Sequence, residues 1–418
     1  MYIKEISNEE FNQYIIDNNY NSIYQTVEYL NSMTKQGYDT MLLGLIDNDK
    51  IIGATGILIE TKGRFKYAYA SRGFLTDYNN KEIVKSFTEH IRKYLSKLDI
   101  VAIKLSPMII KNIYNSQKEL LFHNEHYNDI FRYLKQLGFY HLGYNNYFES
   151  LKPRFEAILD LSKPYYQTFN NIKKNFRTKI RAAEKSGIKV YRGDINNIED
   201  LYVLTQKKYP RDKFYFADIY NSFANKGNAS LYYTKLDTKE YLIKCQQLYE
   251  NQESFNIDID NSILLNNSNK DKLINQKLVA DKLLNKYERR LVIATNLLKE
   301  HPEGIITSSM LIITNDDTVY MYMDGYDKRY QFLNSKHLLL WKLIEKYSLQ
   351  GYKKFNLGGI INPFSDNQRY NGLNEFKLSF NPHIVEYLGD LELICNNALY
   401  FMYINSNQLK NLIKNNRN

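Results

Sequence analysis

Two stretches of sequence decide the fold: residues 41–60, MLLGLIDNDKIIGATGILIE, and residues 305–326, IITSSMLIITNDDTVYMYMDGY. In each stretch, two runs of mostly aliphatic residues flank a short turn of Asp and Asn, which is typical of a β-hairpin. A glycine-containing loop, an amphipathic helix and a further strand follow each hairpin. The shared order predicts a duplicated α/β unit built on mixed sheets. The helix and strand are expected at 81–98 and 100–105 in the first half, and at 335–350 and 353–359 in the second.

The chain as a whole is long, basic and rich in tyrosine. Its 418 residues exceed what one ordinary core supports, so two domains are expected. Hydrophobic residues make up 44% of it, and the 38 tyrosines predict many half-buried rings whose hydroxyls stay bonded or wet. The net charge of +10 favours polyanionic partners, such as tRNA, a nucleotide-linked substrate or an anionic membrane face. A diffusely basic surface is an equally weighted alternative.

The cysteines and the termini indicate a cytoplasmic protein. Cys245 and Cys395 lie far apart in ordinary contexts, which predicts neither a disulfide framework nor a zinc site. The first residues, MYIKEISNEEF, do not form a secretory leader, and no run of about 18 apolar residues occurs. Residues 409–418 carry three basic side chains and no acid, which favours an additional, peripheral contact with the inner face of the membrane.

Residues 239–303 differ in character from the rest because they are polar, rich in Asn and free of glycine. We expect two antiparallel helices joined by a turn within 256–271 and ended by the His-Pro-Glu-Gly run at 301–304. The preferred interpretation is a protruding coiled-coil arm, and the alternative is a helical subdomain packed on the core. The apolar seam has the 3/4 spacing of heptads and comprises Ala280, Leu284, Tyr287, Leu291, Ala294 and Leu298, with Leu242, Cys245 and Tyr249 on the partner helix.

A basic cluster lies in the stretch KKNFRTKIRAAEK at 173–185. Its cations occupy more than one face of the expected helix, so they are not all buried. Lysine and arginine side chains displace counterions from phosphates, which predicts an RNA-contact surface; a solvated helix face is the alternative. The residues concerned are Lys173, Lys174, Arg177, Lys179 and Arg181, followed by Lys185.

A second motif that could take part in catalysis is YNGLNEFKLSFNP at 370–382, where Lys377 stands between Phe376 and Phe380. A lysine held at a partly dry site stabilises an oxyanion formed during acyl transfer. The alternative is a lysine that lies along an aromatic surface with its ammonium in water. The sequence contains no GxSxG elbow, P-loop or HExxH, and no glycine-rich loop of the kind that holds the pyrophosphate of acetyl-CoA. A different acyl donor is therefore expected.

Together these pieces resemble the Fem family of peptidyltransferases over nearly the whole chain, and the arm and Arg-Gly loop look closest to its first-residue enzyme. The resemblance implies two acetyltransferase-like (GNAT-like) α/β domains with mixed sheets and a coiled-coil arm inserted in the second. It implies a first domain at 1–153 with 384–418 packing back, a second at 154–238 and 304–383, and the arm at 239–303. It rests on residues 67–82 (YAYASRGFLTDYNNKE), 101–107 (VAIKLSP), 175–190 (NFRTKIRAAEKSGIKV), 300–305 (EHPEGI), 355–364 (FNLGGIINPF) and 370–381 (YNGLNEFKLSFN).

The resemblance also implies a reaction. Glycine, serine or alanine is taken from an aminoacyl-tRNA and joined to the side-chain amine of the third stem-peptide residue of a peptidoglycan precursor, either lipid II or UDP-MurNAc-pentapeptide. The donor ester is already activated, so neither ATP, a cofactor nor a metal is expected. Negative charge develops on the tetrahedral intermediate, so a fixed cation is the expected catalytic group. Partnership with other Fem proteins or with a second copy is an additional expectation.

The family's motifs carry roles onto individual residues. Lys377 is the expected catalytic cation, and the basic helix is expected to contact tRNA. Two positions depart from the family pattern: Ser106 stands where an acidic residue precedes the proline, and Ala217 stands where an arginine binds phosphate. These departures motivate one alternative, a non-catalytic or immunity-type relative. A second alternative, an acyl-CoA-dependent N-acyltransferase with the same fold, is disfavoured by the missing pyrophosphate loop. The residues expected to bind substrate are Lys35, Arg72, Tyr78, Ser106, Arg211, Tyr215 and Phe376.

Overall fold

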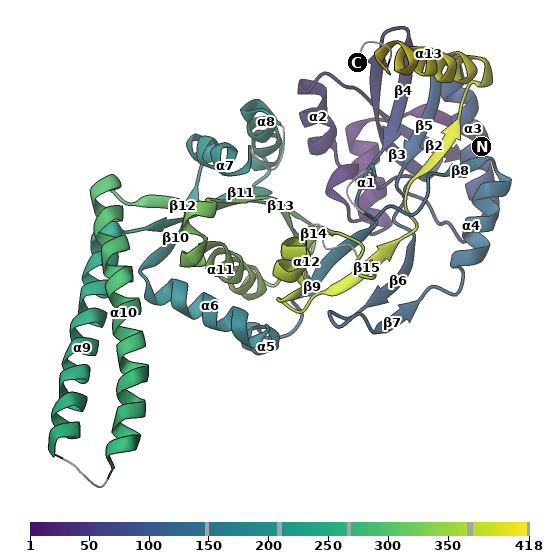
Figure 1. Ribbon diagram of the computed structural model, residues 1–418. Helices are drawn as coiled ribbons and strands as arrows, with labels where there is room; N and C mark the ends of the chain where they lie inside the picture. The colour runs from purple at the N-terminus through teal and green to yellow at the C-terminus, as the bar shows by residue number, and fades with distance from the viewer. Residues whose placement is uncertain (147–149, 207–210, 266–268, 366–370, 416–418) are drawn as a thin grey trace.

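The computed structural model describes residues 1–146, 150–206, 211–265, 269–365 and 371–415, with side chains to residue 406. Two mixed β-sheets with helices on their faces form the body, and a long helical hairpin projects from one end (Figure 1). The fold class expected from the sequence is thus confirmed. The basic side chains expected in residues 409–418 lie outside the described side chains. Within the described part of the chain, no helix has the length and apolarity needed to cross a membrane.

The first sheet has seven strands in the order β1-β2-β3-β4-β5-β16-β8, and only β4 and β5 pair in parallel. The turn between β2 and β3 places Asn48 and Asp49 at φ values of 47° and 61°, as the tight turn of a twisted hairpin requires. Its strands are β1 (Tyr2–Glu5), β2 (Asp39–Asp47), β3 (Lys50–Lys62), β4 (Phe65–Ala70), β5 (Ile100–Leu105), β8 (Phe139–His141) and β16 (Leu391–Ile394). The helices of this half are α1 (Asn8–Asp17), α2 (Val27–Lys35), α3 (Lys81–Lys97), α4 (Tyr127–Gln136) and α13 (Asn397–Asn415), with a 3-10 turn η1 (Ile23–Gln25).

The second sheet has nine strands in the order β10-β11-β12-β13-β14-β9-β15-β6-β7. Its strands are β6 (Ile110–Tyr114), β7 (Leu120–His123), β9 (Phe155–Asp160), β10 (Ile188–Gly193), β11 (Ala229–Leu236), β12 (Ile305–Asn315), β13 (Thr318–Tyr326), β14 (Lys354–Ile360) and β15 (His383–Tyr387). The helices are α5 (Tyr165–Asn171), α6 (Lys174–Lys185), α7 (Ile198–Thr205), α8 (Lys213–Ala224), α11 (Ser335–Leu349) and α12 (Asn371–Leu378), with 3-10 turns η2 (Ile195–Asn197) and η3 (Lys328–Leu333).

The two predicted hairpins form, but they are not equivalent positions of the repeat. In the first sheet the helix α3 connects the parallel strands β4 and β5, and in the second α11 connects the parallel strands β13 and β14. The hairpin β2–β3 therefore matches β11–β12 in the topology, and β12–β13 matches β3–β4. The sequence comparison was one strand out of step because a long insertion separates β11 from β12.

That insertion is the arm, made of α9 (Thr238–Leu265) and α10 (Lys270–Glu300), which stands clear of both sheets (Figure 1). The range 256–271, expected to hold the turn, is largely helical, because α9 continues to Leu265 and α10 begins at Lys270. The helix continues because Ile259 is buried and the buried Asn256 amide donates to Asp281 Oδ1 of α10 at 2.7 Å. The seam was also partly wrong near the base, where Leu297 rather than Leu298 is buried.

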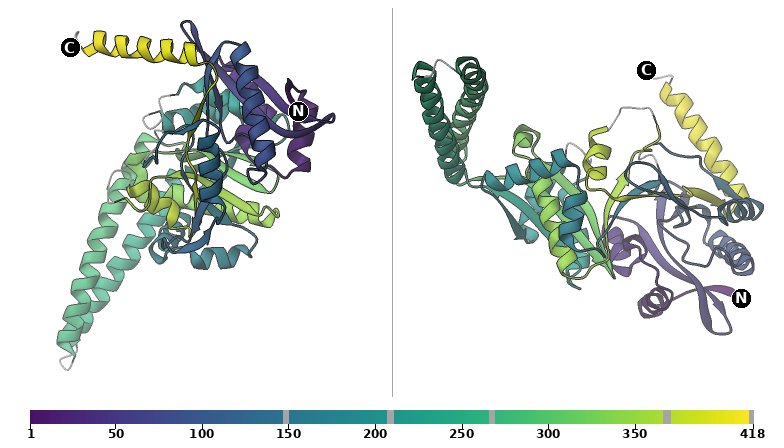
Figure 2. Two further views of the ribbon diagram at one scale, coloured as in Figure 1. Left: turned by 90° about the vertical axis from the view of Figure 1, so that its right-hand side faces the viewer. Right: turned by 90° about the horizontal axis from the view of Figure 1, so that it is seen from below.

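The chain crosses between the two sheets more than once. Residues 110–123, which lie within the range expected for the first domain, form β6 and β7 at the edge of the second sheet. Near the C-terminus, β15 lies in the second sheet between β9 and β6, and β16 lies in the first between β5 and β8. The arm and α13 lie at opposite ends of the molecule (Figure 2). The expected domain boundaries stay a prediction.

Candidate active site

A buried ion pair joins the two sheets. Arg72 follows β4 in the left-handed region, with φ of 59°, and its Nη2 lies 2.6 Å from Glu156 Oε1 on β9. The guanidinium also donates to the carbonyl oxygen of Pro153 at 2.9 Å and lies 4.2 Å from the ring centroid of Tyr387. The other oxygen of Glu156 accepts from the Asn356 amide at 2.9 Å. Both charges are thus buried with several partners each, as a stable buried ion pair requires.

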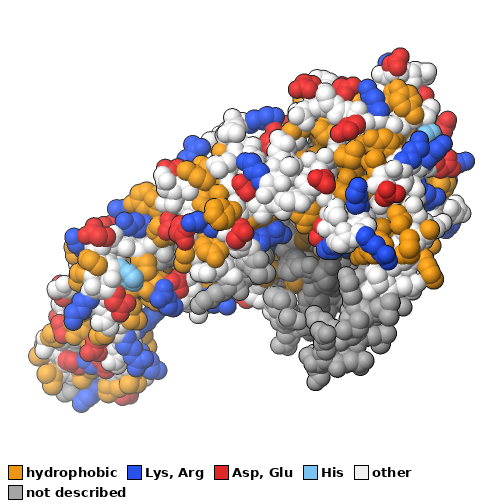
Figure 3. Space-filling view, turned by 90° about the horizontal axis from the view of Figure 1, so that it is seen from above, with side chains coloured by type: hydrophobic (Ala, Val, Ile, Leu, Met, Phe, Trp, Pro, Cys, Tyr) orange, Lys and Arg blue, Asp and Glu red, His pale blue; other side chains and the backbone are white. Residues whose placement is uncertain are grey.

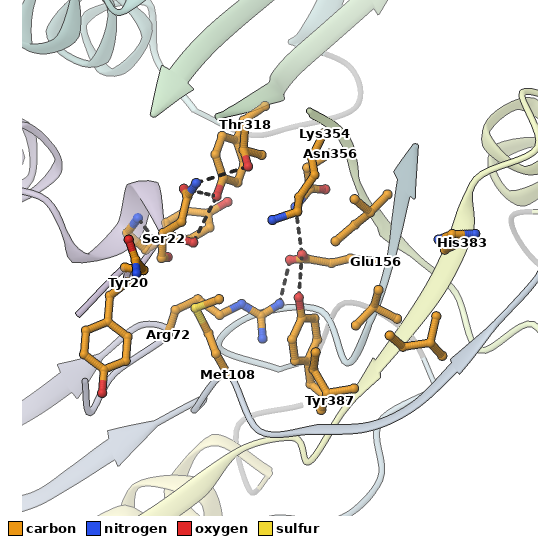
Figure 4. A pocket seen from close by; sticks show the side chains of 18 of the residues that line it. Tyr20, Ser22, Arg72, Met108, Glu156, Thr318, Lys354, Asn356, His383 and Tyr387 are labelled. Atoms are coloured by element: carbon orange, nitrogen blue, oxygen red, sulfur yellow. Dashed lines mark hydrogen bonds and ion pairs between the residues drawn. The ribbon is translucent and has the colours of Figure 1, made fainter. Parts of the chain in front are cut away.

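Beside this pair lies a cavity of about 690 Å³ lined by residues from both halves of the chain (Figure 4). Figure 4 shows the Arg72 side chain reaching across it toward Glu156. Tyr78, expected to bind substrate, lines this cavity, and its hydroxyl bonds the backbone of Phe74 in the loop after β4. The labelled lining residues are Tyr20, Ser22, Arg72 and Met108 from the first half, and Glu156, Thr318, Lys354, Asn356, His383 and Tyr387 from the second.

Ser106 supports the Arg72 loop from behind. Its side chain is buried, and its Oγ accepts a hydrogen bond from the Arg72 backbone N–H at 3.2 Å. The serine hydroxyl is therefore engaged with the protein backbone. Ser106, which stands where an acidic residue was expected, therefore lies next to the Arg72–Glu156 pair. It is not among the residues that line the cavity.

Half-buried Lys152 lies in a cluster of tyrosines near the same junction. Its Nζ is 3.5 Å from the ring centroid of Tyr24 and 5.6 Å from that of Tyr29. Burial, followed by the nearby charges of Arg72 and Arg211, lowers the pKa of Lys152 to about 7. Among the described residues, no carboxylate lies within ion-pair distance of this amine. It therefore changes charge near neutral pH and is suited to an anionic ligand or to proton exchange.

The expected acceptor residues Lys35, Arg211 and Tyr215 lie on or beside two helices that pack together, α2 and α8. Lys35 is exposed, and its Nζ is 3.9 Å from Asp218 on α8. The Arg211 guanidinium lies 4.1 Å over the ring of Tyr215, whose hydroxyl is 2.5 Å from that of Tyr322. The structure therefore brings these three predicted residues together where α2 meets α8. The positive charges of Arg211 and Arg72 both act on Lys152.

Lys377 on α12 lies where two strands of the second sheet separate. β13 and β14 pair only over residues 318–320 and 354–356, after which β14 bulges. In the bulge, Gly358 has φ of 79° and its N–H donates to Asn356 Oδ1 at 2.7 Å. The buried Lys377 ammonium donates to the carbonyl oxygen of Gly359 at 2.8 Å. A bonded path therefore runs from Arg72 through Glu156 and Asn356 to the strand that holds Lys377.

Phe376 is buried under two groups from α11. The Lys336 ammonium lies 4.0 Å from its ring centroid and forms a buried ion pair with Asp324 at 2.5 Å. The His337 ring lies 5.2 Å from Phe376 and 4.9 Å from Phe176 of α6. Burial, then the charges of Lys179 and Lys336, lowers the pKa of His337 to about 4, so the ring is neutral at physiological pH. Phe376 thus anchors α12, the helix that carries Lys377, in the protein interior.

The cations of the basic helix α6 differ in how far they are exposed to solvent. Lys173, Lys174 and Arg181 are exposed, whereas Arg177 and Lys179 are half-buried. The Arg177 guanidinium donates to the Asn170 carbonyl oxygen at 2.8 Å, and Lys179 lies 4.4 Å over the ring of Phe176. Phe176 contacts His337, which contacts Phe376, and the backbone N–H of Lys173 donates to the Ser379 carbonyl oxygen at 3.0 Å, so α6 packs close to the helix that carries Lys377.

Sequence reasoning missed Lys152, Glu156, Asn356 as a bonded partner, and Lys336. Glu156 gives one signal, because a carboxylate near the start of the apolar run FEAIL, well before the terminal Asp160, implies a buried partner. Lys152 gives none, because its neighbours are brought together only by the tertiary structure. Among the described residues, no three His, Cys, Asp or Glu side chains gather so that they could hold a metal ion.

The chain is similar to known proteins along almost its full length. A family model described as the FemAB family matches residues 6–406. Aminoacyltransferase FemA from Staphylococcus epidermidis is 24% identical over 395 residues, covering 90% of this chain and 91% of that protein. Lipid II:glycine glycyltransferase from Staphylococcus aureus (strain MRSA252) is 25% identical over 410 residues, covering 94% and 93%. The solved structure of FemX has a similar fold, with a TM-score of 0.71 and 23% identity over 96% of this chain and 99% of FemX.

Proposed function

The chain belongs to the FemAB family, and from that premise we propose that it is an aminoacyltransferase of peptidoglycan bridge synthesis. The proposed donor is an aminoacyl-tRNA carrying glycine, serine or alanine. The proposed acceptor is the stem-peptide amine of a lipid II-type precursor. The names of the relatives, aminoacyltransferase and lipid II:glycine glycyltransferase, support the reaction class and the acceptor.

The position of Lys377 is the observation that carries the mechanism. In the proposed reaction, the neutral acceptor amine attacks the ester carbonyl carbon, and a C–N bond forms. The C–O bond to the tRNA ribose then breaks, and the ribose oxygen takes up the proton that the amine loses. The transient oxyanion needs a cation that is already in place, and Lys377 is buried and held by the Gly359 carbonyl at 2.8 Å.

The acceptor is proposed to lie on the α2–α8 side of the junction. There Lys35 and Arg211 supply charge for the precursor's phosphates, and Tyr215 supplies an aromatic wall. Lys152, with no carboxylate at ion-pair distance among the described residues, adds a third cation to this side. The loop with Arg72 and Tyr78 shapes the approach of the stem peptide toward Lys377.

The donor tRNA is proposed to lie across α6, which has exposed cations and whose first residues lie close to the end of α12, where the Lys173 N–H donates to the Ser379 carbonyl oxygen. Domain boundaries at 153/154 and 383/384, with the arm at 239–303, remain part of this proposal. We also propose a peripheral contact with the membrane, because a lipid-linked acceptor would lie there.

Transfer is tested directly by incubating the protein with glycyl-, seryl- and alanyl-tRNA in separate reactions, each with lipid II and with UDP-MurNAc-pentapeptide. The expected result is a mass increase of the precursor by one aminoacyl residue with at least one donor. Acetyl-CoA replaces the tRNA in a parallel reaction. A precursor that is bound but gains mass with none of the charged tRNAs would overturn the proposal, and a gain from acetyl-CoA alone would reassign the donor.

A further inference from the structure

Asn356 stands at the point where β14 leaves the ladder that it shares with β13. It is the last residue of β14 that pairs on both sides, opposite Tyr320 of β13 and Ile158 of β9. The next ladder contact of β14 comes at Gly359, so the two residues between them form a bulge. Backbone groups in a bulge lose their ladder partners and need others. The side chain of Asn356 is placed to supply one.

The amide of Asn356 makes one hydrogen bond in each direction. Its Oδ1 accepts from the N–H of Gly358 within the bulge at 2.7 Å, and its Nδ2 donates to Glu156 Oε2 at 2.9 Å. A backbone N–H only donates and an ionised carboxylate only accepts, so these two bonds fix which way the amide faces. A carboxylate at position 356 would keep the first bond and lose the second.

The side chains on this path are buried. On the face seen in Figure 3, charged side chains of both signs stand at the surface. By contrast, Arg72, Glu156, Asn356 and Lys377 each have at most 6% of their surface exposed. Figure 4 shows the Asn356 and Arg72 side chains both directed at Glu156. A buried amide or charge that loses its partner does not regain one from water, so these bonds are costly to break.

The far end of the path is Lys377. The carbonyl of Gly359, which accepts from its ammonium at 2.8 Å, belongs to the first residue of β14 that pairs again after the bulge. Gly358 and Gly359 are adjacent, so a change in the bulge moves this carbonyl. The place of the Lys377 ammonium therefore depends on the shape of the bulge. A shift of about 1 Å at a catalytic group costs about 10²-fold in rate.

We propose that Asn356 is a positioning residue for the transfer reaction, which holds the bulge of β14 in the shape that keeps Lys377 in place. This inference rests on the proposed function, because it assigns Asn356 to the same reaction. The amide ties the bulge to the Arg72–Glu156 pair. The loop that the stem peptide approaches and the lysine that meets the donor ester are thereby held in one arrangement. Asn356 acts through Lys377 and takes no part in the bond changes at the ester.

The main test is the Asn356→Asp variant, which has nearly the same shape but places a second carboxylate opposite Glu156. Its kcat is expected to fall about 10–100-fold, with the precursor Kd within about twofold of that of the wild type. Two carboxylates at hydrogen-bond distance share a proton more readily at low pH. The ratio of variant to wild-type kcat is therefore expected to rise severalfold between pH 8 and pH 6. While both proteins are folded, a merely structural role would leave this ratio constant.

Two further variants separate positioning from a general loss of stability. Asn112 is also a buried amide that donates to a glutamate of the second sheet, Glu386, at 2.8 Å. The Asn112→Asp variant is expected to lose stability in urea as Asn356→Asp does, but to keep the wild-type kcat. Glu156→Gln/Asn356→Asp exchanges the donor and the acceptor of the bond. It is expected to restore kcat to within about fivefold of the wild type and to remove the pH dependence of the ratio.

A second measurement follows Lys377 without the reaction. The folded protein is treated with acetic anhydride, and the rate at which Lys377 is acetylated is measured by mass spectrometry. A buried amine reacts only when its surroundings open, and a loosened bulge opens more often. Acetylation of Lys377 is therefore expected to be severalfold faster in Asn356→Asp and unchanged in Asn112→Asp.

The inference and the proposed function fail in different ways. An unchanged kcat in Asn356→Asp would overturn the inference. So would a lower kcat without faster acetylation of Lys377, because the effect would not pass through the ammonium. A weaker precursor affinity with normal kcat would overturn it in favour of a role in acceptor binding. A wild-type protein that transfers nothing from any charged tRNA overturns the proposed reaction, and the acetylation rates then decide whether Asn356 holds Lys377.

Discussion

Arg72 and Glu156 form the contact on which the junction of the two sheets depends. Replacing Arg72 by Met leaves a buried carboxylate without its cation, which is expected to lower the free energy of unfolding by about 3–5 kcal/mol. Urea unfolding followed by circular dichroism measures the loss. In the Arg72→Met/Glu156→Met double variant, the loss is expected to be smaller than the sum of the two single losses. Strict additivity would show that the two side chains do not act as a pair.

Lys377 is expected to matter for the chemical step rather than for acceptor binding. The Lys377→Met variant keeps a side chain of similar length but removes the charge that the oxyanion needs. Its kcat for aminoacyl transfer is expected to fall by about 10²–10³-fold, with the precursor Kd unchanged. Lys346→Met, on α11 in the same half of the chain, serves as the matched control. Full activity of Lys377→Met would exclude the proposed role.

Lys152 predicts a pH dependence of stability. Burial, then Arg72 and Arg211, lowers the pKa of Lys152 from its ordinary 10.5 to about 7 in the folded protein. Between these two pH values the unfolded chain binds the proton and the folded chain does not, so this group makes stability rise with pH. The Lys152→Met variant is expected to lack that rise. It should exceed the wild type in stability most below pH 7, and the difference should vanish near pH 10.5.

Urea unfolding of both proteins at several pH values between 6 and 10 checks this expectation. Lys93→Met, which replaces an exposed lysine of α3, is expected to show the same pH dependence as the wild type. A constant difference between Lys152→Met and the wild type across this range would contradict the assignment.

The bulge of β14 is an element whose shape fixes Lys377. Gly358 has φ of 79°, and a Cβ built there would lie 3.4 Å from Lys377 Nζ. The Gly358→Ala variant is expected to lose about 1–2 kcal/mol of stability from its left-handed backbone. Its kcat is expected to fall roughly ten- to hundredfold, because relief of the backbone strain shifts the adjacent Gly359 carbonyl that holds the Lys377 ammonium. Gly351→Ala is the matched control, since it has φ of 86° with nothing within 4 Å, and should lose stability without losing kcat.

At the level of elements, the sequence predicted those helices and hairpins whose formation depends on residues close together in the chain. The helix expected at 335–350 is observed as Ser335–Leu349, because its apolar spacing and its capping turn lie within one segment. The hairpin β2–β3 follows from its turn residues for the same reason. The sequence matched the hairpin β2–β3 to β12–β13, whereas in the topology it corresponds to β11–β12. This match was wrong because it depends on which strands pair in parallel, and neither hairpin sequence encodes that pairing. The range expected for the turn of the arm was wider than the turn itself, because Asn256, a polar residue that suggested a loop, bonds from α9 to Asp281 of α10.

At the level of the whole molecule, the site was predictable only where a motif carried its own chemistry. Lys377 stood out between two phenylalanines, and Arg72 stood in a distinctive loop. Glu156, Lys152 and Asn356 come from separate strands and loops, and only the packing of the two sheets brings them near Arg72. The lowered pKa of Lys152 cannot be read from its neighbours in sequence, because tertiary packing buries the amine and the charges that add to this effect, Arg72 and Arg211, lie far along the chain.

The crossing of the C-terminal strands between the sheets has a consequence for folding during synthesis. β15 and β16 are separated only by residues 388–390, yet each is an interior strand of a different sheet. Until residue 394 leaves the ribosome, β8 has no partner in the first sheet, and β6 and β7 have no attachment to the second. β8 therefore stays unpaired, and the β6–β7 pair stays unattached to the second sheet, until residues 383–394 have been synthesised.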